Sequence, residues 1–154
     1  MEEAMQAKDI MTPNPSCCTP ETSLRECAQM MVDHDCGEIP VLDAQGKPIG
    51  VITDRDICCR AVAKGIDTNG ARVGEFMTTP AITVSEDDTE ERCIGVMEEH
   101  MIRRVPVVDT QGVCCGIMAQ ADLAQRLAPQ PVSHMLREVS TPTDHASRLF
   151  HDKA

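Results

Sequence analysis

The sequence repeats itself once, and one register holds along most of its length. Met11-Thr12 recurs 66 residues later as Met77-Thr78, and the same spacing relates Asp56 to Asp122. Further matches at this spacing are Cys27 with Cys93, His34 with His100, Pro40-Val41 with Pro106-Val107, and Gly50 with Gly116. A repeat without a gap marks a duplicated structural unit, so we expect two related halves.

Each half predicts the order strand, helix, strand, strand, helix. In the first half, residues 24–31 place Leu24, Cys27, Ala28 and Met31 on one helix face. The predicted elements are short extended pieces at 14–18 and 80–85, strands at 39–43, 48–53, 105–109 and 113–119, and helices at 54–64 and 120–127. A half of this size is too small to be stable alone. We therefore predict a mixed α/β (α+β) fold in which two pseudo-twofold repeats share one core.

The repeat also divides the chain into segments. We expect the first repeat at 8–64, a polar, glycine-bearing linker at 65–73, the second repeat at 74–128 and a C-terminal tail at 129–154. The tail has three prolines and weak periodicity, and we expect only a short helix around 132–138 in it.

The charge balance excludes several classes of partner. The chain has 25 Asp and Glu against 14 Lys and Arg, a net charge of −11, and neither Trp nor Tyr. Nucleic-acid binding needs clustered cations or aromatic platforms, and this chain lacks both signals. The start is acidic, and no apolar run reaches the ~18 residues of a membrane span. We expect a soluble, cytoplasmic protein that binds neither nucleic acid nor membrane.

Nine cysteines stand out in such a chain, and three of their pairs are adjacent in sequence: Cys17-Cys18, Cys58-Cys59 and Cys114-Cys115. Adjacent cysteines on a strand point apart and chelate one metal ion poorly, and no Cys-x-x-Cys occurs. We therefore expect reduced thiols that serve as small apolar groups, and no metal site. Redox sensing or metal binding is the less favoured alternative.

The first candidate binding segment is residues 50–57, an apolar strand that runs directly into a helix. Thr53 is a natural N-cap, and the N–H groups beyond it suit an anion such as phosphate. Asp56, one turn later, can accept hydrogen bonds from the two hydroxyls of a ribose. On local sequence alone, a helix start with a Thr-x-x-Asp capping pair is the favoured explanation of the segment.

The second candidate segment is the pair Arg103-Arg104, which precedes a predicted central strand. Adjacent arginines suit bidentate recognition of phosphate. The alternative is a solvated pair that balances the acidic helix start at 86–91.

Together these segments resemble the CBS domain, named for cystathionine β-synthase, in two tandem copies covering roughly residues 8–128. The matching segments of the first copy are Asp9-Ile10-Met11-Thr12-Pro13, Met31-Val32-Asp33-His34, Ile39-Pro40-Val41-Leu42-Asp43 and Gly50-Val51-Ile52-Thr53-Asp54-Arg55-Asp56-Ile57. Those of the second are Glu75-Phe76-Met77-Thr78, Met97-Glu98-Glu99-His100, Arg104-Val105-Pro106-Val107-Val108-Asp109 and Gly116-Ile117-Met118-Ala119-Gln120-Ala121-Asp122-Leu123. The resemblance implies a pseudo-twofold module, commonly assembled as a homodimer, that binds adenosine ligands at the seam between the copies.

Carried over residue by residue, the resemblance implies two sites. The first set is Val51, Thr53, Asp56, Ala81, Ile82, Arg103 and Arg104. In it Asp56 would hold the ribose, the arginines the phosphate, and the apolar residues the adenine.

The second, weaker set is Ser16, Gly37, Glu38, Ile117, Ala119 and Asp122. There Ala119 stands in place of Thr, and Gly37-Glu38 in place of the arginines, so Glu38 would repel phosphate. We expect the first site to be the better nucleotide site, and the second to be empty, weak or suited to a less charged nucleoside.

No catalytic set of residues emerges, so we do not expect an enzyme and expect no required cofactor. The predicted function is a stand-alone regulatory module that senses an adenosine nucleotide of the AMP, ADP or ATP class and modulates a protein partner or its own dimer. The alternatives are a structural dimerisation protein without ligand, a sensor of NAD or S-adenosylmethionine, and the cysteine-based protein already mentioned.

Overall fold

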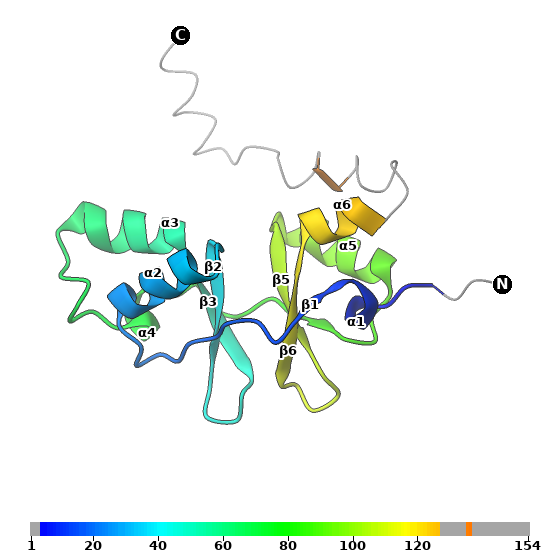
Figure 1. Cartoon of the computed structure of the whole chain (residues 1–154), viewed down its shortest axis with the longest axis horizontal. Coiled ribbons are helices and arrows are strands. Elements are labelled where there is room, and N and C mark those ends of the chain that lie inside the picture. The colour runs from blue at the N-terminus through cyan, green and yellow to red at the C-terminus, as the bar shows by residue number, and fades with distance from the viewer. Residues whose placement is uncertain (1–3, 127–134, 137–154) are drawn as a thin grey trace, which may run out of the picture.

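The computed structural model describes residues 4–126 together with Met135 and Leu136 (Figure 1). Two sheets stand face to face at the centre of the molecule, and helices cover the outer side of each. The helices are α1 (Ala7–Ile10), α2 (Leu24–Asp33), α3 (Asp54–Asp56), α4 (Val73–Phe76), α5 (Glu90–His100) and α6 (Gln120–Arg126). The π-helical turn η1 (Ile57–Ala61) and the 3₁₀ turn η2 (Val62–Lys64) continue α3. The expected mixed α/β fold is confirmed.

Antiparallel hairpins form the centre of both sheets. In the first repeat, β2 (Glu38–Leu42) pairs with β3 (Pro48–Thr53). In the second, β5 (Arg104–Val108) pairs with β6 (Cys114–Ala119), and the sheet order is β1-β6-β5-β4 with β1 at Thr12–Pro13 and β4 at Val84–Ser85. The register matches between the repeats, since Ile39 lies opposite Ile52 as Val105 lies opposite Met118.

Alternation along the central strands separates the core from the seam between the sheets. Ile39 and Val41 are fully buried in the first core, whereas Glu38 and Pro40, on the other face of β2, line a cavity at the seam. The start of β5 repeats this pattern, since Val105 is in the second core and Arg104 lines the cavity.

The two repeats exchange their leading segments. Helix α1 opens the first repeat, yet Ala7 and Ile10 are buried in the second core, and β1 pairs with β6 of the second repeat. In return, Val73 of α4 is buried in the first core, and the backbones of Thr78 and Val51 exchange hydrogen bonds of 3.0 and 2.8 Å. The two repeats therefore share their cores by exchanging these segments. The cores are two hydrophobic clusters rather than one cluster between the sheets, because polar residues at the seam separate the two clusters.

The helix starts follow from local sequence. The hydroxyl of Ser23 accepts a hydrogen bond from the Glu26 N–H at the start of α2, and Thr89 does the same at α5. The predicted tail helix at 132–138 lies mostly outside the described residues. Met135 and Leu136 are helical, and Met135 is buried in the second core. No helix among the described residues is long and apolar enough to cross a membrane.

Candidate functional site

A cavity of about 410 Å³ lies at the seam between the two sheets. Both repeats line it, and its lining residues are Thr12, Asn14, Pro15, Ser16, His34, Cys36, Glu38, Pro40, Arg104, Ile117, Ala119, Ala121 and Asp122. It contains every residue of the second predicted set except Gly37, and only Arg104 of the first set. Its volume falls within the range typical of small-molecule sites.

Asp122 offers hydrogen-bond capacity to this cavity. Its Oδ2 accepts a hydrogen bond of 2.8 Å from the Ala119 N–H, which caps the start of α6. Among the described residues, its Oδ1 has no hydrogen-bond partner, and the side chain lines the cavity. An oxygen in this position can accept a hydrogen bond from a hydroxyl of a bound molecule.

Glu38 places a buried carboxylate oxygen beside the same cavity. Its Oε2 is inaccessible to solvent and has no hydrogen-bond partner among the described residues. Burial raises the pKa of this carboxyl to about 7; Asp56 acts in the same direction and Arg104 in the opposite one. Glu38 and Arg104 hold equivalent positions in the two repeats, and both line the cavity.

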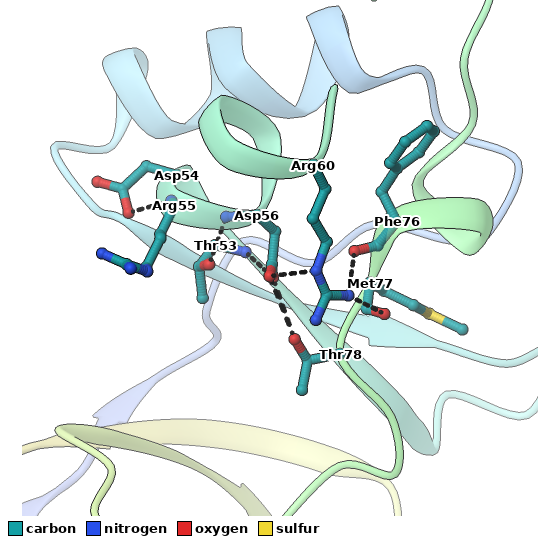
Figure 2. Close-up of polar contacts among 8 residues, drawn as sticks. All are labelled: Thr53, Asp54, Arg55, Asp56, Arg60, Phe76, Met77 and Thr78. Atoms are coloured by element: carbon teal, nitrogen blue, oxygen red, sulfur yellow. Dashed lines mark hydrogen bonds and ion pairs between the residues drawn. The ribbon is translucent and has the colours of Figure 1, made fainter. Parts of the chain in front are cut away.

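Asp56 is the equivalent of Asp122, but its carboxylate makes its hydrogen bonds to other residues of the protein (Figure 2). Only 8% of the residue is exposed. Its Oδ2 accepts from the Thr53 N–H at 3.1 Å, and its N–H donates to the Thr53 hydroxyl at 3.0 Å, so both halves of a capping box form. The Thr78 hydroxyl lies 3.3 Å from both carboxylate oxygens, and Nε of Arg60 lies 3.6 Å from Oδ1. The interpretation of Thr53 and Asp56 as a capping pair is therefore correct locally.

The remaining residues of the first set have contacts in different parts of the fold. Val51 forms a β-bridge with Thr78. Ala81 and Ile82 are half-buried, and Ile82 packs against the second core. Arg103 is exposed, and its carbonyl accepts from the Gln120 N–H at 2.9 Å. The binding role of the first set, and its ranking above the second, stay predictions.

Several residues that line the cavity or contact Asp56 were not predicted as site residues from the sequence. Thr12, Asn14, His34 and Pro40 line the cavity, and Thr78 and Arg60 contact Asp56. The repeat spacing contained part of this information, because Thr12 matches Thr78 as Asp122 matches Asp56. The spacing of Arg60 from Asp56, four residues on a helix, is a second signal.

All nine cysteines are free thiols. Cys18, Cys27 and Cys93 are buried, and burial raises the pKa of the Cys93 thiol to about 11. Among the described residues, no three His, Cys, Asp or Glu side chains gather closely enough to hold a metal ion.

Comparison with known proteins decides the family. A family model for the CBS domain matches residues 7–61 and 73–129, which is most of the chain. The chain belongs to the CBS domain family. As a CBS pair, it is similar along nearly its whole length to hypoxic response protein 1 of Mycobacterium tuberculosis, which is 33% identical over 141 residues, covering 92% of this chain and 98% of that protein.

Solved CBS pairs share the fold. The crystal structure of hypoxic response protein I with two coordinated zinc ions matches with a TM-score of 0.74 and 35% identity, covering 80% of this chain and 100% of that one. The CBS pair of MJ0100, in complex with methylthioadenosine and S-adenosylmethionine, matches with a TM-score of 0.70 and 30% identity over 80% of this chain and 95% of that one. The structure of CBSX2 with AMP gives 0.67 and 28%, over 78% and 93%.

Proposed function

We propose that this CBS pair is a regulatory module, not an enzyme, and that it binds an adenosine-containing ligand in the seam cavity. The observation that carries the proposal is that residues of both repeats line one cavity of about 410 Å³. Adenosine ligands bound to the CBS pairs of MJ0100 and CBSX2 support the ligand class.

The lining residues suggest a role for each part of the ligand. The Oδ1 atom of Asp122 accepts from a ribose hydroxyl, while Pro40 and Ile117 offer apolar contact to the base. The guanidinium of Arg104 is the cation available to an anionic group. The chain has no Trp or Tyr to stack on adenine, so aliphatic contacts hold the base and the expected affinity is moderate.

Regulation follows from the position of the cavity. A ligand that contacts both repeats favours one relative arrangement of them, and any surface that senses this arrangement is coupled to ligand concentration. Assembly as a homodimer is part of the proposal. Its support is a groove along α2 and the helix that follows β3, where Val32 and Val62 are 74% and 58% exposed.

Calorimetric titration with adenosine and AMP tests the proposal. Asp122→Asn keeps an oxygen for the Ala119 N–H cap but loses the carboxylate, so we expect about tenfold weaker adenosine binding. Arg104→Ala should weaken AMP binding, while Arg103→Ala, the neighbouring arginine outside the cavity wall, should leave it unchanged. Weaker AMP binding in both arginine variants would place the ligand at the first set, and no binding of any adenosine compound would favour a structural protein.

A further inference from the structure

We infer that Glu38 sets the charge specificity of the seam cavity, so that neutral or cationic adenosine compounds bind more tightly than those with a terminal phosphate. This inference rests on the proposed function, because it concerns the ligand class of the same cavity. The charge specificity comes from the residues of this chain that line the seam cavity.

The geometry of Glu38 supports this role. The residue opens β2 on the seam face, opposite Thr53 of β3, and its Oε2 is buried without a partner among the described residues. An unpaired buried acceptor is costly to the protein alone. A ligand that carries a positive charge in the cavity is attracted by this carboxylate, whereas a phosphate adds a second negative charge beside it.

Arg104 does not cancel this effect within the described structure. It is partly exposed, and no ion pair within 4.0 Å joins it to Glu38. The guanidinium can turn toward solvent, while the carboxylate oxygen stays within the wall. A further acidic side chain, Asp122, lines the same cavity, so the negative character does not rest on Glu38 alone.

The charge state of Glu38 makes the selectivity dependent on pH. Asp56 of α3 and Arg104 of β5 act on the charge of Glu38, and His34 at the end of α2 and Asp122 of α6 line the same cavity. Burial raises the pKa of Glu38 to about 7, so the carboxyl is mostly neutral at pH 6 and charged at pH 8.5. Discrimination against phosphate should therefore be weak at pH 6 and strong at pH 8.5.

Three probes that share adenosine but differ in charge test the inference: AMP, 5′-methylthioadenosine and S-adenosylmethionine. Calorimetry at pH 8.5 should give wild-type protein an affinity for methylthioadenosine at least about tenfold above that for AMP. Glu38→Gln, which keeps the shape, should improve AMP binding about tenfold, weaken S-adenosylmethionine binding and change methylthioadenosine binding little. Glu99→Gln, at an exposed position of α5, removes the same charge outside the cavity lining and should change none of the three.

The pH series separates Glu38 from other titrating groups. The difference in AMP affinity between wild type and Glu38→Gln should shrink when the pH falls from 8.5 to 6, because the carboxyl of Glu38 becomes mostly neutral while the amide of Gln does not titrate. Equal AMP-to-methylthioadenosine ratios in wild type and Glu38→Gln at pH 8.5 would overturn the role of Glu38 while leaving the proposed function standing. If none of the three probes binds either protein, the proposed function falls and this inference falls with it.

Discussion

The hydroxyl of Thr78 in the second repeat donates to the carboxylate of Asp56 in the first, at 3.3 Å from either oxygen. The bond joins the helix that follows β3 to the exchanged segment that pairs with that strand, and Arg60 reinforces it by donating to the carbonyl of Phe76 at 3.2 Å. Asp56 therefore caps its helix and links the repeats at the same time (Figure 2).

We predict that Asp56→Ala destabilises the protein by about 2–3 kcal/mol, because it removes one half of the capping box of α3 and leaves the Thr53 N–H and the Thr78 hydroxyl without their acceptor. Urea denaturation measures the free energy of unfolding. Asp54→Ala is the matched control, since that exposed carboxylate accepts only from its neighbour Arg55 among the described residues, and should cost less than about 0.5 kcal/mol. Equal losses for the two variants would contradict the linking role.

Two glycines should respond oppositely to alanine. A Cβ on Gly50 of β3 would lie 2.7 Å from the Thr78 carbonyl oxygen, where the exchanged segment crosses the strand. We expect Gly50→Ala to destabilise by about 1–3 kcal/mol because backbone must shift. A Cβ on Gly95, inside α5, would meet no described atom within 4 Å, so Gly95→Ala should stabilise by about 0.5–1 kcal/mol.

Thermal and urea unfolding measure both glycine effects. A neutral Gly50→Ala would mean that the Val51–Thr78 pairing is loose, and that the exchange of leading segments contributes little to stability.

Glu38 should make stability depend on pH. Its pKa rises from 4.5 in an exposed carboxyl to about 7 in the folded protein, so the folded state holds its proton more tightly. The stabilisation linked to that proton is fully present below pH 4.5 and is lost progressively up to about pH 7. The wild type should lose roughly 3 kcal/mol relative to Glu38→Gln across this interval, with a constant difference above it.

Chemical denaturation of wild type and Glu38→Gln at pH 5, 6, 7 and 8 measures this change. Only the change of the difference with pH is diagnostic, because the amide of Gln has its own burial cost at every pH. A difference that stays the same from pH 5 to pH 8 would show that Glu38 is solvated in the folded protein.

The repeat, the order of the main helices and central strands, and the helix caps could be predicted from the sequence, but the short helices α1 and α4 were not predicted. These features depend on contacts between residues close in the chain, such as Ser23 with Glu26 and Thr53 with Asp56. The CBS resemblance, and with it the mixed fold, could be recognised for the same reason. The grouping of the second set was also accessible from the repeat, because five of its six residues line one cavity.

The difference between equivalent residues, in contrast, arises from contacts that exist only in the folded chain. Asp56 and Asp122 have the same local capping pattern, yet Thr78 and Arg60 occupy the carboxylate of Asp56, while Asp122 borders an open cavity. A repeated sequence does not reveal which leading segment packs on which half, because both pairings satisfy the same pattern. The position of Glu38 and Arg104 around one cavity likewise depends on how two sheets face each other across the seam, because the two residues are far apart in the chain.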